Sequence, residues 1–134
     1  MRPVRPRPVP SEESRAFWDG LAAGELLLRW CATCARLEHP RSARCPRCLS
    51  ETDWRAVSGQ ALLRSWTTVH RSFVPGFEPP YVVGRVGPVE RPDIDLDTEL
   101  LLEREPYPGM PLEVIFREDA RGFTVHAFGP AAER

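Results

Sequence analysis

The sequence predicts a mainly β protein in which a short N-terminal helix and a four-cysteine ribbon precede a small five-stranded barrel. Three observations support this order. Four cysteines, the only ones in the 134 residues, form two Cys-x-x-Cys pairs between positions 31 and 48. Ahead of them, apolar residues recur at helical spacing. After Ser58-Gly59, five apolar runs alternate with glycine, proline or charged turns, as in an all-β fold.

The first 24 residues predict an N-terminal arm and one helix. Residues 1–10 are a Pro/Arg segment that favours an extended chain. Ser11 can cap a helix, two acidic residues follow it, and Gly24 can end the helix, so we expect helix from about Ser11 to about Ala23. Core packing is the simpler role for the aromatic face of this helix, and partner contact is the alternative. This face consists of Phe17, Trp18 and Leu21.

Residues 25–57 predict a metal ribbon. Each Cys-x-x-Cys pair can form a tight knuckle, and together they offer four thiolates to one tetrahedral ion, so we expect structural zinc. Iron is the minor metal alternative. The alternative to metal binding is a pair of disulfides. Disulfides need an oxidising compartment, and the absence of an apolar secretory run in residues 1–10 argues against them. The expected ligands are Cys31, Cys34, Cys45 and Cys48, and the expected strands are Glu25 to Trp30, Leu37 to Glu38 and Asp53 to Val57.

Residues 58–134 predict the barrel. A first strand long enough to bend and serve both sides favours an OB-fold, with an open sheet or an SH3-like barrel as alternatives. The run from Asp93 to Glu99 alternates acidic and apolar residues, which indicates a strand with one acidic face, either solvated or directed at a basic partner. Trp30, Trp54 and Trp66 are expected in the core. The five runs are Gln60 to Phe73, Tyr81 to Val89, Ile94 to Glu103, Leu112 to Arg117 and Phe123 to Phe128.

Composition narrows the function. A net charge of −1 gives no basic field for nucleic acid, and no stretch approaches the ~20 apolar residues of a membrane helix. All 18 basic residues are arginine, which excludes lysine chemistry such as Schiff-base catalysis. The cysteines are assigned to metal, and no nucleophile elbow or glycine-rich phosphate loop is present. We expect a cytoplasmic protein with no catalytic residues of its own.

The sequence also resembles a known family, the rubredoxin-like zinc-ribbon plus OB-fold proteins associated with acyl-CoA metabolism. The resemblance runs from about Phe17 to Phe128. Its most specific part is the Trp-to-Arg strand followed by the Tyr-Val strand. The matching stretches are Phe17 to Leu21, Gly24 to Cys34, Cys45-Pro46-Arg47-Cys48, Val57-Ser58-Gly59, Ser65 to Arg71, Pro80 to Val83 and Gly109 to Val114.

The resemblance implies an accessory role. Family members resemble non-catalytic subunits of thiolase-superfamily enzymes, including aldolases that shorten steroid side chains, and some are fused or paired with a hotdog-fold hydratase. It therefore implies zinc as the metal, a thiolase-like partner, and help in assembling or covering an acyl-CoA site in lipid metabolism. The alternatives are a single-stranded nucleic-acid-binding module and a stand-alone acyl-CoA enzyme, which near-neutral charge and the missing nucleophile respectively disfavour.

The sequence differs from the family pattern in two places, and one barrel loop holds candidate binding residues. The family usually has glycine after each Cys-x-x-Cys, where this sequence has Ala35 and Leu49. We expect both residues to adopt a left-handed backbone, which costs a non-glycine residue about 1 kcal/mol. The acidic run at 93–102 is the other departure, and it could set partner specificity. Barrel loops often bind ligands, so Arg71 is expected to meet a coenzyme A phosphate or a partner's acid. The expected partner-interface residues are Phe17, Trp18, Leu21, His70, Phe73 and Phe77.

Overall fold

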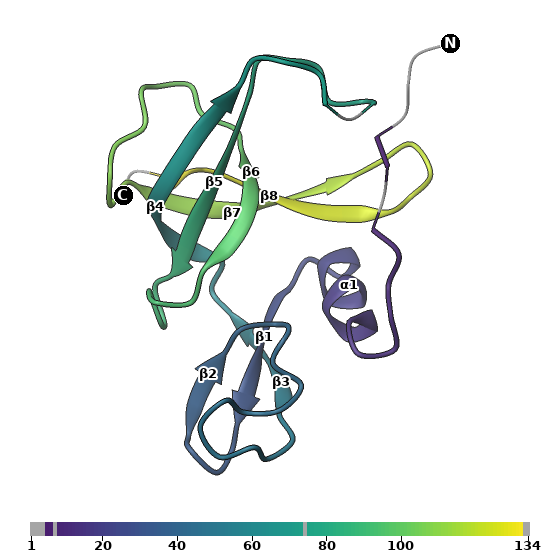
Figure 1. The fold of residues 1–134 in the computed structure, drawn as a ribbon, viewed down its shortest axis with the longest axis vertical. Helices are drawn as coiled ribbons and strands as arrows, with labels where there is room; N and C mark the ends of the chain where they lie inside the picture. Colours follow the sequence, from purple (N-terminus) through teal and green to yellow (C-terminus); the bar gives the residue numbers. More distant parts are fainter. Residues whose placement is uncertain (1–4, 7, 74, 133–134) are drawn as a thin grey trace.

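The computed structural model describes residues 5–6, 8–73 and 75–132, and it is mainly β with one helix (Figure 1). Residues 1–4 and 7 of the expected arm lie outside the described residues. The elements, in chain order, are α1 (Arg15–Ala22), β1 (Leu26–Cys31), β2 (Arg36–Glu38), β3 (Asp53–Val57), β4 (Gln60–Val69), β5 (Tyr81–Pro88), β6 (Leu96–Leu100), β7 (Pro111–Glu118) and β8 (Thr124–Pro130).

Helix α1 begins four residues later than the sequence predicts. Ser11 and Ser14 hydrogen-bond each other through backbone and hydroxyl groups, so the expected cap forms a turn ahead of the helix instead. The end is as predicted, because Gly24 has a φ of 78° and Glu25 N–H donates to Gly20 O at 2.8 Å, closing the last turn. The buried face of α1 contains Phe17, Gly20 and Leu21.

The ribbon is a three-stranded antiparallel sheet in the order β2-β1-β3. Strand β3 has the predicted bounds, and β1 and β2 each lie within one residue of theirs at either end. Cys31 ends β1, so the first knuckle starts where the central strand stops. The sheet therefore holds the first cysteine pair on its middle strand, next to the chain reversal that leads to β2.

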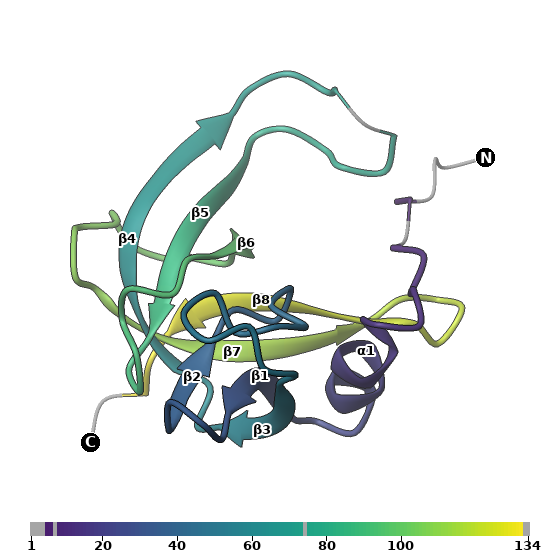
Figure 2. The same cartoon turned by 60° about the horizontal axis from the view of Figure 1, so that its bottom comes forward.

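The second half is the predicted five-stranded closed barrel, in the order β4-β5-β6-β8-β7. All pairs are antiparallel except β6–β8, which is parallel and joins the strands at Glu99–Ala127 and Leu100–Phe128 alone. Strand β6 is shorter than the predicted run, since Ile94 N–H closes a turn onto Arg91 O. In Figure 2 the hairpin of β4 and β5 arches over β7 and β8, which lie across the other side of the barrel.

One hydrophobic core joins helix, ribbon and barrel. Phe17 and Leu21 from α1 and Leu28 from β1 belong to the same cluster as Leu63 and Phe128 of the barrel. The arrangement of helix, ribbon and barrel is therefore fixed by apolar contacts, and side chains at their junction can form a defined site.

Of the three tryptophans expected in the core, two are partly buried and one is exposed. Trp54 packs against the core at its edge, and Trp30 lies half-buried under the guanidinium of Arg55 at 3.6 Å. Trp66 is a correction, because its side chain is 36% exposed. It lies opposite Gly84, which has no side chain to cover it. The one helix in the described part of the chain, α1, is not long and apolar enough to cross a membrane.

Candidate functional site

The four cysteines meet at the tip of the ribbon. Their sulfur atoms lie within 4.8 Å of one another, with Cys31 Sγ 3.5 Å from Cys48 Sγ and Cys34 Sγ 3.9 Å from Cys45 Sγ. A tetrahedral ion with metal–sulfur bonds of about 2.3 Å separates its sulfurs by about 3.8 Å. The donor set therefore fits a four-coordinate metal ion, and it leaves no further position for water or substrate.

The two knuckles have the backbone geometry that such a site requires. Cys34 N–H donates to Cys31 Sγ at 3.3 Å, and Arg47 N–H donates to Cys45 Sγ at 3.4 Å. The residue after each pair has a left-handed backbone, with φ of 52° at Ala35 and 64° at Leu49, as predicted. These conformations turn the chain so that both sulfurs of a pair face the same centre.

The electrostatics of the cluster call for a cation. Hydrogen bonding to Cys48, with burial and the other thiols, raises the pKa of Cys34 to about 12. Hydrogen bonds from the hydroxyl and backbone of Ser50 lower the pKa of Cys48 to about 6. Sulfurs this close resist simultaneous ionisation, so a divalent ion is what makes four thiolates compatible.

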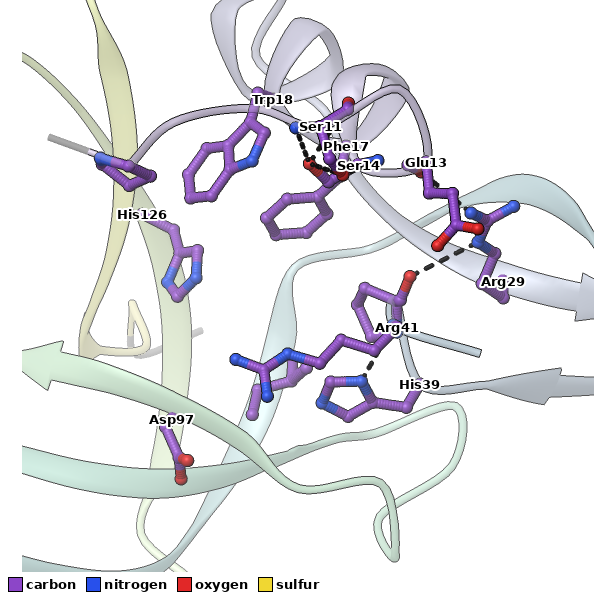
Figure 3. Close-up of a pocket in the computed structure, with 13 residues that line it drawn as sticks. Ser11, Glu13, Ser14, Phe17, Trp18, Arg29, His39, Arg41, Asp97 and His126 are labelled. Carbon is purple, nitrogen blue, oxygen red and sulfur yellow. Dashed lines mark hydrogen bonds between the residues drawn. The ribbon is translucent and has the colours of Figure 1, made fainter. Parts of the chain in front are cut away.

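A cavity of about 710 Å³ opens at the junction of helix, ribbon and barrel (Figure 3). The start of α1 contributes Phe17 and Trp18, and β8 contributes His126. The segment after β2 contributes His39 and Arg41. We call this cavity the junction pocket. The other lining residues are Pro8, Ser11, Glu13, Ser14, Arg29, Pro40, Leu96 and Asp97.

Arg29 holds the ribbon side of the junction pocket together. Its side chain is almost fully buried, and its guanidinium stacks on the Trp54 ring at 3.8 Å. It donates to the backbone carbonyl of Glu13 at 2.9 Å, and to those of Pro40 and Thr52 at 3.3 and 3.4 Å. Desolvation lowers its pKa, and the Glu13 carboxylate opposes that shift. Arg29 thus ties the chain before α1 to the ribbon.

His126 forms the barrel wall of the junction pocket. Its Nδ1 lies 3.0 Å from the Thr98 hydroxyl, and its ring meets Phe17 edge to face at a centroid distance of 6.0 Å. Burial lowers the pKa of His126. Within the described part of the chain, no carboxylate hydrogen-bonds this imidazole, so Thr98 and His126 lack the third member of a catalytic triad.

The other residues singled out from the sequence lie in two separate places. Phe17 and Leu21 are 9% and 1% exposed, so both pack in the core and little of their side-chain surface is accessible to a partner. Trp18 is half-buried against Phe123 at 5.5 Å. The β4–β5 loop, away from the junction pocket and the cysteines, holds His70, Arg71, Phe73 and Phe77.

In that loop, exposure differs from residue to residue. His70 and Arg71 are exposed, and Phe73 is 74% exposed. Phe77 is half-buried, because its ring packs on Tyr81 at 5.6 Å and lies under the guanidinium of Arg5 at 4.2 Å. Phe73 therefore has the most accessible aromatic ring of the loop.

The acidic face of β6 and its preceding turn is bound to arginines of the same chain. Glu99, whose side chain is 12% exposed, contacts Arg5 at 3.1 Å and also Arg117. The other ion pairs are Arg64–Asp95, Arg85–Asp97 at 2.9 Å and Arg91–Asp93 at 3.1 Å. The side chains of Asp93, Asp95 and Asp97 are 69%, 41% and 75% exposed, so this face agrees with the solvated alternative, with its charges paired to arginines of the same chain.

The junction pocket could not be predicted from the sequence. Its charged and aromatic side chains come from the start of α1, from β1, from the segment after β2 and from two barrel strands, so no local spacing marks them. An isolated histidine such as His39 or His126 is most simply a structural or surface residue, so neither marks the pocket in the sequence. The one available signal was the concentration of Phe, Trp and Ser at the start of the predicted helix.

Comparison with known proteins agrees with the two-part architecture. The rubredoxin-like zinc ribbon domain of ChsH2 matches residues 18–54, and the C-terminal OB-fold domain of ChsH2 matches residues 54–117. A solved structure described as an Ltp2-ChsH2(DUF35) aldolase is 29% identical, with a TM-score of 0.82 over 94% of this chain and 100% of that one.

Two further relatives are more distant in coverage or identity. A probable enoyl-CoA hydratase alpha subunit of Thermomonospora curvata is 29% identical over 96% of this chain, which spans 40% of that protein's length. A protein of unknown function from the DUF35 family of Sulfolobus solfataricus shares the fold, with 15% identity and a TM-score of 0.63 over 79% of each chain. With ribbon and barrel both matched, the chain belongs to the ChsH2/DUF35 family, which joins a rubredoxin-like zinc ribbon to an OB-fold.

Proposed function

We propose that this chain is a non-catalytic accessory subunit of a thiolase-superfamily acyl-CoA enzyme, most specifically an aldolase that degrades steroid side chains. It helps to assemble or cover the acyl-CoA site of that partner. The main support is the similarity to the Ltp2-ChsH2(DUF35) aldolase, which extends over the whole of the matched chain.

The chemistry of the described residues supports an accessory role. All four cysteines lie in one cluster, so none is left as a thiolase-type nucleophile. The sequence has no lysine for Schiff-base chemistry. The Thr98–His126 pair is largely buried and has no carboxylate to orient it, so it lacks the arrangement that activates a hydroxyl.

We propose zinc as the metal of the cysteine cluster, with Cys31, Cys34, Cys45 and Cys48 as ligands. Zinc favours four thiolates in a tetrahedron, and the sulfur separations of 3.5 and 3.9 Å agree with that geometry. With every position taken by the protein, the ion supplies folding free energy and no catalysis. Its role is to keep the ribbon folded beneath α1 and the barrel.

The β4–β5 loop is the part of the surface that best suits the aldolase partner. Phe73 is exposed and large, and Arg71 beside it can pair with a partner's acid or with a coenzyme A phosphate. A hotdog-fold hydratase is a second candidate partner. It is supported by the name of the Thermomonospora curvata relative, of which this chain spans 40%.

A nucleic-acid-binding role has less support. Arg64, Arg85, Arg91 and Arg117 pair with Asp95, Asp97, Asp93 and Glu99 respectively, so acidic side chains lie beside these arginines and reduce their attraction for phosphates. The net charge of −1 also gives no long-range attraction to a polyanion.

The test is reconstitution. The chain is co-expressed with a candidate thiolase-like protein similar to the Ltp2 component of the related aldolase, and the complex is isolated by size-exclusion chromatography. Carbon–carbon cleavage of a steroid β-hydroxyacyl-CoA is then measured for the chain alone, the partner alone and the two together. We expect activity only with the complex. Activity of the isolated chain, or full activity and stability of the partner without it, would contradict the accessory role.

A further inference from the structure

The junction pocket has the size and lining of a small-molecule site. Its volume of about 710 Å³ falls within the roughly 300–1,000 Å³ of ligand pockets. Phe17 and Trp18 supply aromatic surface, with Leu96 and prolines completing the apolar walls. The Phe17 and Trp18 rings meet at 79°, so they present two different planes to the pocket (Figure 3). A ligand with an apolar ring body suits these walls.

Most charged groups of the pocket are already committed. Arg29 donates to three backbone carbonyls and stacks on Trp54. Asp97 pairs with Arg85 at 2.9 Å. Burial lowers the pKa of both His39 and His126, so these rings are neutral near neutral pH. They add hydrogen-bonding groups to the pocket and no charge.

Arg41 is the cation of the pocket that has no such partner. Its backbone N–H donates to His39 Nδ1 at 3.0 Å, which fixes the start of the side chain. Its guanidinium makes no hydrogen bond or ion pair with any residue that the structure describes, and in Figure 3 it extends into the space below Phe17 and Trp18. The indole N–H of Trp18 likewise has no hydrogen-bond partner among the described residues. The pocket thus offers one available cation beneath an aromatic roof.

The charged side chains that line the pocket favour a ligand with a single negative charge. A guanidinium binds a planar carboxylate through two parallel hydrogen bonds. The carboxylates of Glu13 and Asp97 also line the pocket, and they disfavour a dianion such as a phosphate monoester. We propose that the junction pocket binds a small organic monocarboxylate with an apolar ring body, with the carboxylate on Arg41 and the ring against Phe17 and Trp18. This goes beyond the proposed function and does not depend on it, since the pocket lies within one chain.

The test compares two probes of the same shape on the isolated zinc-loaded chain. Calorimetric titrations with 2-naphthoate and with uncharged 2-naphthamide measure the contribution of the carboxylate. A hydrogen-bonded charge pair favours naphthoate by at least about tenfold in Kd, with one site per chain. The NMR resonance of the Trp18 indole N–H should shift on binding, which locates the probe in the junction pocket.

Two arginine variants separate the pocket from general charge effects. Arg41→Gln should remove the preference for naphthoate and leave the Kd for naphthamide within about twofold of the parent. Arg15→Gln is the matched control, because Arg15 is an exposed arginine of α1 that does not line the pocket, and it should keep the preference. Circular dichroism checks the fold of both. Absence of saturable naphthoate binding, equal binding of the two probes to the parent, or a preference that survives Arg41→Gln would each overturn the proposal.

Discussion

Arg91, in the loop between β5 and β6, places its Nη1 3.0 Å from Oε1 of Glu38 at the end of β2. The Glu38 side chain is only 5% exposed, and Arg36 Nε lies 2.8 Å from the same oxygen. Arg91 also donates to the backbone carbonyl of Leu37. A nearly buried carboxylate of the ribbon is thus neutralised partly by the barrel, which makes this pair a polar link between the two.

We predict that Arg91→Ala lowers the free energy of unfolding by about 2 kcal/mol. Removing one partner of a buried ion pair leaves the other charge short of compensation, which costs up to 3–5 kcal/mol where nothing replaces it. Here Arg36 stays beside Glu38, so the expected cost is about half of that. Chemical denaturation of the zinc-loaded chain measures it.

An exposed pair on the barrel supplies the matched control for Arg91. Arg64 pairs with Asp95, but both side chains are more than 40% exposed, so Arg64→Ala should change stability by less than about 1 kcal/mol. If the two variants lose the same stability, burial of Glu38 is not what gives the Arg91 contact its weight.

We predict that Cys45→Ser prevents stoichiometric zinc binding and unfolds the ribbon. Cys45 is fully buried and its sulfur accepts a hydrogen bond from Arg47 N–H, so the loss affects the centre of the cluster. Structural zinc contributes roughly 10–16 kcal/mol to small domains of this kind, more than the ribbon can lose. Metal analysis and the near-ultraviolet signal of Trp30 and Trp54 report the change. A Cys45→Ser chain that keeps one zinc and a parental spectrum would exclude a four-cysteine site.

The fold could be predicted because its main signals are local. Paired cysteines mark the ribbon, β3 from Asp53 to Val57 ends at the Ser58-Gly59 turn, and Gly24 ends the helix with a positive φ that glycine tolerates. Contacts between distant segments have no such signal. The pairing of Trp66 with Gly84 across the strand, and that of the acidic run at 93–99 with arginines of β4, β5 and β7, cannot be read from the local sequence.

We predict that Ala35→Gly and Leu49→Gly each leave zinc binding intact and raise the stability of the zinc-loaded chain by up to about 1 kcal/mol. Both residues have left-handed backbones, with φ of 52° and 64°, which a side chain disfavours and glycine does not. The Leu49 side chain is 68% exposed, so its removal costs little packing. The more flexible unfolded chain offsets part of the gain. Denaturation at saturating zinc measures the difference, and a loss above about 1 kcal/mol in either variant would show that the side chain itself is needed.

We predict that His126→Gln makes stability less dependent on pH below about 6.5. Burial lowers the folded-state pKa of His126 from its usual 6.5, so the folded chain binds fewer protons than the unfolded chain. Stability from this group is therefore complete above the unfolded value and falls as the pH drops through it. Glutamine can keep a hydrogen bond to Thr98 but cannot take up the proton. Unfolding curves across this range, at saturating zinc, compare the slopes.

His39→Gln is the companion variant for this measurement. Burial and the Arg41 charge lower the pKa of His39 as well, so its replacement should flatten the same part of the curve, and the two effects should add. Slopes that match the parent in both variants would mean that neither histidine limits stability in acid.

We predict that Phe73→Ala weakens binding of the aldolase partner by at least about thirtyfold, which corresponds to about 2 kcal/mol, and leaves the Tm of the isolated chain unchanged. Phe73 is 74% exposed and makes no aromatic contact within the described residues, so the fold does not depend on its ring. Arg71→Ala should also weaken the complex, and its effect should shrink at high salt because it removes a charge from the surface.

Phe77→Ala should affect both binding and the fold, since its ring packs on Tyr81 and under Arg5 and its loss loosens the loop as well. Tyr107→Ala is the control, an aromatic residue that is 48% exposed in the β6–β7 loop. Calorimetry against the partner ranks the four variants. If Tyr107→Ala weakens the complex and Phe73→Ala does not, the partner contacts the β6–β7 loop, and the β4–β5 loop is not the interface.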